Sequence, residues 1–134
     1  MAFDDQFRLS VHAVFTDEMG KILQLRSTYD GNRWGLPGGS LEPGETIHEA
    51  LIRECHEELG VNIDILYMSG MYFHKAYHSH ACIFRCDMQN GSEITLSAEH
   101  SDYRYFTLDE LSAIQRHRVL DCLQFDGKVK SEKF

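Results

Sequence analysis

The chain has 134 residues, of which 43% are hydrophobic and 25% are charged. This length and composition suit one globular domain with its own core, so we expect residues 1–134 to form a single domain. The formal net charge of −8 argues against a protein that holds nucleic acid stably, because phosphate backbones call for a basic surface.

The chain also lacks the marks of export or membrane insertion. Its first ten residues carry two aspartates and no apolar centre, unlike a signal peptide. No apolar run is long enough to span a bilayer. The four cysteines fit neither a zinc pattern nor a disulfide framework, which predicts free thiols and a cytoplasmic location; they are Cys55, Cys82, Cys86 and Cys122.

The first third of the chain alternates strand-like and turn-like segments. Residues 8–15 and 21–26 alternate apolar and polar residues, so we expect two strands of a hairpin that turns at 17–20. A loop at 27–33 and a short extended piece at 34–39 follow. This part of the chain is therefore predicted to be mostly β-structure.

One helix is signalled clearly from both ends. Thr46 with Glu49 three residues later predicts a capping box, and Gly60 predicts the end of the helix at Leu59. Leu51, Cys55 and Leu59 would form its apolar stripe.

The remaining segments mix strands and helices without strict alternation, which predicts an α/β fold with a mixed sheet between helices. We expect both ends of the chain, 1–6 and 128–134, to be flexible. The expected strands are 63–73, 81–86, 94–96 and 103–106, and the expected helices are 108–115 and 119–125.

The predicted helix carries a cluster of acidic residues. Glu54, Glu57 and Glu58 are spaced by three and four positions, so they share one face. Three carboxylates on one face repel each other unless a positive charge lies among them. A hard divalent cation, which prefers oxygen ligands, is the natural candidate.

The acidic cluster belongs to a longer pattern between residues 39 and 61. A glycine is followed after five residues by Glu45, after seven more by Arg53-Glu54, and then by the Glu57-Glu58 pair and a glycine. This pattern resembles the Nudix box, and only Cys55 departs from it, at a position that is usually aliphatic. A chance match is roughly one in a million or rarer on average residue usage. The resemblance implies an α/β/α sandwich.

The resemblance also implies an activity. Nudix proteins are hydrolases that use Mg²⁺, or Mn²⁺ in its place, to cleave the diphosphate linkage of a nucleoside diphosphate derivative by water attack at phosphorus. A (d)NTP, ADP-ribose or a nucleotide sugar would suit equally. A nucleotide-derived small molecule is thus the expected partner, and a homodimer is compatible with the family.

The family pattern assigns roles to individual positions of this chain. Glu54, Glu57 and Glu58 would bind the metal with the carbonyl of Gly38. Arg53 and Glu45 would pair and so hold the loop against the helix. The base that activates water stays open between Glu54, Glu58 and Glu99, the last lying outside the box.

Substrate contacts are less sharply indicated. Arg26 and Arg33 lie near the box and could bind phosphate, although either could be a surface residue. Tyr29 and Phe73 could stack on a base, as could Tyr77 and Tyr105, although aromatic residues on strands are more often core. His74, His78 and His80 form a histidine-rich segment, but no carboxylate or cysteine completes a metal set there.

Two other functions fit the sequence less well. A non-catalytic Nudix-fold binding module would be expected to lose box glutamates, and all are present. An RNA 5′-end pyrophosphohydrolase is disfavoured by the acidic net charge, although a local basic patch could offset it. That patch would comprise Arg26, Arg33, Lys75 and Arg104.

Overall fold

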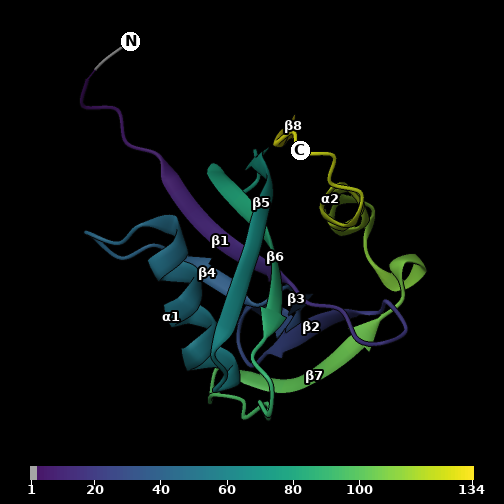
Figure 1. Ribbon diagram of the computed structural model, residues 1–134. Helices are drawn as coiled ribbons and strands as arrows, with labels where there is room; N and C mark the ends of the chain where they lie inside the picture. Colours follow the sequence, from purple (N-terminus) through teal and green to yellow (C-terminus); the bar gives the residue numbers. More distant parts are fainter. Residues whose placement is uncertain (1–2) are drawn as a thin grey trace.

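The computed structural model describes residues 3–134, and its elements form two sheets and two helices (Figure 1). The elements are β1 (Arg8–Val14), β2 (Ile22–Ser27), a 3₁₀ turn (Asp30–Asn32), β3 (Trp34–Gly35), β4 (Gly38–Ser40), α1 (Ile47–Leu59), β5 (Ile63–His74), β6 (Ser79–Met88), β7 (His100–Phe106), a 3₁₀ turn (Leu108–Glu110), α2 (Ala113–Leu123) and β8 (Lys130–Lys133).

The larger sheet has the strand order β4-β1-β6-β5-β8, and the smaller one has the order β3-β2-β7. In the larger sheet β1 runs parallel to β6 and β5 runs parallel to β8, while the other pairs are antiparallel. The sheet is therefore mixed, as predicted, and α1 and α2 lie on opposite sides of it in Figure 1.

Strand β1 divides its side chains between two cores. Val11 and Ala13 are buried in the cluster that α1 covers, which includes Leu51 and Cys55. Val14 is buried in the other cluster, together with Val119 and Cys122 of α2. Because side chains alternate along a strand, His12 shares the α2 side with Val14.

Helix α1 begins and ends as the sequence predicted. The Thr46 hydroxyl accepts a hydrogen bond from the Glu49 amide at 3.1 Å, and the Glu49 carboxylate accepts one from the Thr46 amide at 3.0 Å. Gly60 adopts the left-handed conformation with φ 66°, and its amide donates to the His56 carbonyl. These caps fix where the acidic face of the helix starts and stops.

Of the predicted hairpin of residues 8–15 and 21–26, only the turn at 17–20 forms, where the Asp17 amide donates to the Lys21 carbonyl. The strands were misplaced, because β1 and β2 belong to different sheets, and antiparallel pairing is limited to a bridge between Thr16 and Ile22 and the residues beside it. β1 carries buried residues on both faces, so it lies inside the larger sheet between β4 and β6 instead of pairing with β2. The chain crosses from one sheet to the other at this bridge.

Two further boundaries differ from the prediction. Residues 94–96 form no strand, because the Thr95 amide donates to the carbonyl of Leu59 at the end of α1 instead of to a sheet. The two helices expected at 108–115 and 119–125 are a 3₁₀ turn and one continuous helix, α2. The Ser112 hydroxyl, which accepts from the Gln115 amide, starts α2.

The expected flexible end at 128–134 was also wrong. Lys130–Lys133 forms β8, and the Phe134 amide donates to the Phe73 carbonyl at 2.8 Å. β5 would otherwise present unpaired peptide groups along its outer edge, and β8 satisfies them. At the other end, residues 3–7 form no strand or helix, and residues 1–2 lie outside the described part. Among the described helices, none is both long and apolar enough to cross a membrane.

Candidate active site

Arg53 of α1 is the centre of a dense ionic network. Its Nε donates to Glu45 Oε2 at 2.6 Å and its Nη2 donates to Glu45 Oε1 at 2.9 Å, which is a two-pronged pair. Nη2 also donates to the Ser40 carbonyl at 3.1 Å. The hydrogen bonds from Arg53 lower the pKa of Glu45, so Arg53 ties the loop before α1 to the helix in its charged form.

The same guanidinium reaches three further carboxylates. Nη1 lies 2.9 Å from Glu54 Oε1, 3.2 Å from Glu57 Oε2 and 3.7 Å from Glu42 Oε1. Burial raises the pKa of Glu54, and the hydrogen bond from Arg53 opposes that rise. Glu57 is exposed and so keeps freedom to move. Four carboxylates therefore share one cation, and the cluster still carries excess negative charge.

Glu58 is the most buried of the acidic side chains, with 5% of its surface exposed. Its Oε1 accepts a hydrogen bond from the Gly38 amide at 2.8 Å. Burial raises its pKa to about 8, the Gly38 amide opposes the rise, and the charges of Glu54 and Glu99 add to it. A carboxylate held in this way gains from any nearby cation.

The two glycines of the preceding loop make room for these contacts. A Cβ on Gly39 would lie 2.7 Å from Cδ of Glu54. A Cβ on Gly38, where φ is 148°, would lie 2.0 Å from the Val11 carbonyl oxygen. Gly39 thus lets Glu54 approach the loop, and Gly38 lets β4 pair closely with β1.

The donor types at this site fit a hard divalent cation. Glu54, Glu57 and Glu58 supply carboxylate oxygens, and each of the others contributes to raising the pKa of Glu58. Within residues 3–134, no three side chains of the His, Cys, Asp or Glu type already converge on one point. The residues fit the ion by charge and oxygen chemistry, and the exposed Glu57 is the one most free to turn towards it.

Glu99, the base candidate outside the box, lies close to this cluster. It is exposed in the loop before β7, where its carbonyl accepts from the Thr28 amide at 2.8 Å. Its negative charge contributes to raising the pKa of Glu54, Glu58 and Tyr29. The neighbouring Ser97 amide donates to the Glu58 carbonyl. The fold thus brings Glu99 and α1 to the same place from distant parts of the chain.

His100, which the sequence reasoning missed, lies beside Glu58. Its Nε2 is 3.9 Å from Glu58 Oε2, and burial lowers the pKa of the imidazole. Its Nδ1 is buried without a hydrogen-bond partner among the described residues. An unpaired buried nitrogen of this kind has capacity for a ligand or a water.

A cavity of about 590 Å³ extends from Glu58 to α2, across the side of the large sheet on which His12 lies. We call its two regions the glutamate end (Gly38, Gly39, Glu58 and His100) and the arginine end (His12, His74, Gln115 and Arg118). Tyr29, Arg33, Trp34 and Tyr77 line the cavity between and around these ends.

Two of the four predicted substrate-binding residues reach this cavity. Tyr29 and Arg33 line it, and Arg33 Nη1 donates to the Tyr77 hydroxyl at 2.9 Å. Arg26 does not, because Leu25 and Ser27 face the cavity and the alternation of β2 turns Arg26 away.

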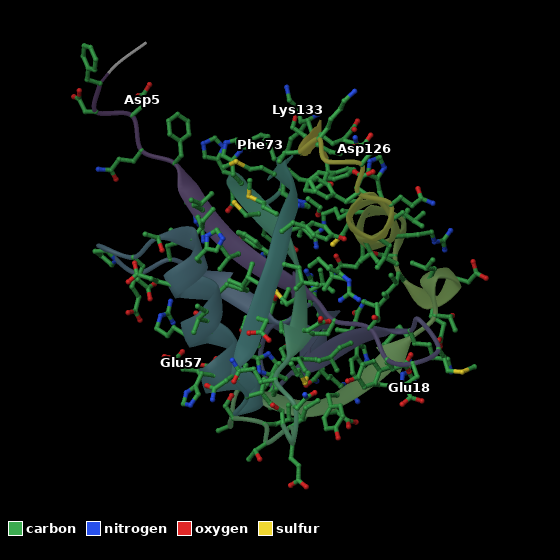
Figure 2. All side chains as sticks on the ribbon, in the orientation of Figure 1. Asp5, Glu18, Glu57, Phe73, Asp126 and Lys133 are labelled. Atoms are coloured by element: carbon green, nitrogen blue, oxygen red, sulfur yellow. The ribbon has the colours of Figure 1, made fainter. Side chains whose placement is uncertain are left out.

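Phe73 does not line the cavity either. It packs on the ring of His80, with the ring centroids 5.0 Å apart. Figure 2 shows it near the end of β5 that lies far from Glu57. Tyr105 is likewise absent from the lining. Of the three clustered histidines only His74 reaches the cavity, since His78 also packs on Phe73.

The arginine end was not predicted. Its residues come from β1, β5 and α2, and no local pattern in the sequence links them. The only available signal was a histidine between apolar residues of β1 and an arginine on the apolar side of α2. Polar residues at such positions are either buried and satisfied or face a cavity, and only the fold distinguishes these cases.

The sequence matches a known family and several known proteins. The family model of the NUDIX domain matches residues 6–122. A MutT-like protein of Streptomyces ambofaciens is 34% identical over 123 residues, which cover 89% of this chain and 79% of that protein. The nucleoside triphosphatase NudI of Enterobacter sp. (strain 638) is 32% identical over 107 residues, covering 70% and 74% respectively.

The fold has solved counterparts as well. The crystal structure of an ADP-ribose pyrophosphatase from Streptococcus suis 89-1591 matches with a TM-score of 0.77 at 19% identity, covering 96% of this chain and 100% of that one. At this identity the likeness concerns the fold alone. It confirms the predicted α/β architecture with helices packed on mixed sheets.

Proposed function

Because the chain belongs to the Nudix family, we propose that it is a Mg²⁺-dependent hydrolase of nucleoside diphosphate derivatives. It cleaves the diphosphate linkage by attack of water at phosphorus. The observation that carries this proposal is the position of Glu58, which faces the cavity from the same helix face as the Arg53-bound glutamates. A substrate in the cavity would therefore meet the acidic cluster through Glu58.

Glu54, Glu57 and Glu58 would hold the metal together with the carbonyl of Gly38. When bound there, the ion would neutralise phosphate charge and lower the pKa of water. Mn²⁺, which takes the same oxygen ligands, is the expected substitute.

Arg53 and Glu45 would not contact the substrate but would position the residues that do. By fixing Glu54 and the 40–45 loop they hold the acidic face in one arrangement. Tyr29 and Arg33 are the cavity residues best suited to contact the nucleotide, one by stacking and one by charge.

The base that takes the proton from water is one of three carboxylates. Glu58 is our first assignment because it is buried beside the cavity. Glu54 is restrained by Arg53, and Glu99 is exposed on a loop, so each is less well placed in this arrangement. Single Glu→Gln variants of the three residues, compared by kcat at saturating Mg²⁺, separate them.

The first test is a hydrolysis screen of the purified protein with and without Mg²⁺. The panel holds the (d)NTPs, ADP-ribose, nucleotide sugars, dinucleoside polyphosphates and triphosphorylated RNA. We expect Mg²⁺-dependent cleavage that Glu58→Gln lowers by about 10²–10⁴-fold without loss of folding. Glu93→Gln, a change at an exposed loop residue, is the matched control and should leave the rate unchanged.

The outcomes distinguish the competing functions. Absence of both hydrolysis and Mg²⁺ binding would instead establish a binding module, whose nucleotide affinity Glu58→Gln would not alter. Cleavage of triphosphorylated RNA alone would establish an RNA 5′-end pyrophosphohydrolase. Arg26, one of the residues of the expected basic patch, lies outside the cavity, so the structure adds no support for RNA.

We also propose that residues 1–134 act as one domain on a small nucleotide-derived substrate, without a stable nucleic-acid complex. A cytoplasmic location is consistent with the four free, buried cysteines. Homodimerisation is a prediction that light scattering of the purified protein tests directly.

A further inference from the structure

Arg118 of α2 lies at the arginine end of the cavity with only 8% of its surface exposed. Its Nη1 lies 2.9 Å from His74 Nε2, and its Nε donates to Gln115 Oε1 at 3.2 Å. Within residues 3–134, none of the ion pairs includes Arg118. This guanidinium is therefore hydrogen-bonded but has no acidic partner.

The groups around Arg118 do not neutralise it. Burial lowers the pKa of Arg118 to about 10, so it stays charged at neutral pH. Burial and the charge of Arg118 lower the pKa values of His12 and His74, so both imidazoles are neutral. Gln115 is uncharged. A buried cation without a counter-ion lowers stability. Folded proteins therefore rarely contain one unless a ligand supplies the missing negative charge.

Two further arginines line the cavity. Arg8 and Arg33 line it near Tyr77, and neither forms an ion pair within residues 3–134. The acidic residues in the lining are Glu58 and Asp30. The cavity thus combines a glutamate end that suits a metal ion with an arginine end that suits an anion.

The hydrogen-bonding groups at the arginine end also match an oxyanion. A guanidinium presents several N–H donors in a planar fork, which suits the oxygens of a carboxylate or phosphate. Gln115 of α2 also lines this space, and its side-chain oxygen accepts from Arg118. Ser10 of β1 lines it too, with its hydroxyl 2.9 Å from His12 Nε2. Polar side chains from two distant parts of the chain therefore lie beside the guanidinium.

We propose that the arginine end is an anion-binding subsite, centred on Arg118, for a phosphate or carboxylate that the substrate carries in addition to its scissile diphosphate. The assignment of this anion to the substrate rests on the proposed function. The subsite itself does not, because a free anion should bind whether or not the protein is a hydrolase. The inferred substrate class is a nucleoside diphosphate derivative with a further oxyanion on one of its two halves.

The direct test is a titration of the 134-residue protein with inorganic phosphate and, separately, with acetate, in buffer with a metal chelator. Without a metal ion the glutamate end offers an anion no cation, so binding reports on the arginine end. NMR signals of the His12 and His74 rings should move on titration. Arg118→Gln should weaken phosphate binding at least tenfold, and Arg118→Lys should weaken it less.

The matched control is Arg26→Gln, which removes an exposed arginine outside the cavity and should leave the affinity unchanged. Circular dichroism and the melting temperature establish that each variant is folded. If Arg118→Gln were to unfold the chain, the histidine shifts of the unaltered protein and of Arg118→Lys would still decide the question. Unmoved histidine signals, or equal affinity in folded Arg118→Gln, would overturn the subsite.

Hydrolysis of matched substrate pairs tests the assignment to substrate. NADPH and NADH differ by one phosphate, and UDP-glucuronate and UDP-glucose differ by one carboxylate, so the two pairs separate the two sources of the anion. We expect at least a tenfold preference in kcat/KM for the anion-bearing member of one pair, lost in Arg118→Gln. Cleavage of both members of each pair at equal rates overturns this assignment. Phosphate binding without any hydrolysis supports the subsite and counts against the proposed function alone.

Discussion

Arg53 and Arg118 are two arginines on two helices with opposite surroundings. Arg53 lies within 4 Å of four carboxylates and is partly exposed. Arg118 is buried and has only neutral hydrogen-bond partners. One helix thus carries more negative charge than its arginine can balance, and the arginine of the other helix has no carboxylate partner among residues 3–134.

The contrast shows how one cavity can bind a highly charged ligand in a protein with a net charge of −8. Excess carboxylates call for a cation, and an unmatched guanidinium calls for an anion. A metal-bound polyphosphate with a second anionic group supplies both at once. The overall charge of the chain says little about the sign of the field at a particular place in the cavity.

The largest of the following effects is expected when the ionic network of Arg53 is removed. Arg53→Met removes the cation that holds Glu45, Glu54 and Glu57, so we expect Mg²⁺ affinity or kcat/KM to fall about 10–100-fold. Arg53→Lys should not restore activity, because an ammonium cannot reproduce the two-pronged pair with Glu45. Arg26→Met is the control, and full activity in Arg53→Met would show that the network has no catalytic importance.

Variants of the two loop glycines are expected to differ, one lowering activity and the other lowering stability. Gly39→Ala places a methyl group against the end of the Glu54 side chain, which can move, so activity should fall about tenfold with little change in melting temperature. Gly38→Ala meets the backbone of β1 at a positive φ and should lower the free energy of unfolding by about 1–3 kcal/mol. Steady-state kinetics and urea denaturation of both variants test this pair, and equal effects on stability would contradict it.

The buried charge of Arg118 is expected to lower the free energy of unfolding of the protein. Arg118→Met replaces an unmatched buried charge with an apolar chain of similar length, so we expect the free energy of unfolding to rise by about 1 kcal/mol or more. The gain should shrink in saturating phosphate, which stabilises only the protein that keeps Arg118. Chemical denaturation with and without phosphate measures this, and a large loss of stability would show that Arg118 is already compensated.

The last prediction is a pH dependence that arises from His12. Burial, and after it the charge of Arg118, lowers its pKa from the usual 6.5 to about 3. As the pH falls from about 6.5 towards 3, the His12 imidazole is therefore protonated in the unfolded chain but not in the folded chain. The stabilising contribution is present above pH 6.5 and is lost on acidification.

Replacing His12 tests this sign. His12→Gln should show a smaller loss in the free energy of unfolding between pH 7 and pH 4 than the unaltered protein, in urea denaturation at each pH. His56→Gln, at an exposed position on α1, is the matched control. An unchanged pH slope in His12→Gln would show that the imidazole is accessible to solvent protons in the folded state.

The acidic face of α1 was predictable because its chemistry lies in one short stretch of sequence. Glu54, Glu57 and Glu58 follow each other on one helix turn, and the caps that position the helix are also local. Their roles as metal ligands and base stay predictions. Glu99 was a guess from its place before a late strand, and the fold brings its charge close to α1.

The arginine end was not predictable, for the opposite reason. His12, His74 and Arg118 meet only because β1 and β5 lie in one sheet and α2 packs over it. Sequence reasoning instead chose Arg26 for its nearness to the box, and the alternation of β2 turned it away. Misplacing β1 in a hairpin also removed the sheet geometry from which the role of His12 could have been inferred.

The labelling rates of two buried cysteines would report on the opening of the two helices. Cys55 lies on α1 behind the glutamates, Cys122 lies on α2 near Arg118, and each belongs to a different core cluster. A thiol shielded in this way reacts with a labelling reagent only when its helix opens. Single-cysteine versions would therefore report whether the two helices loosen together or independently, and whether a metal ion slows one rate while an anion slows the other.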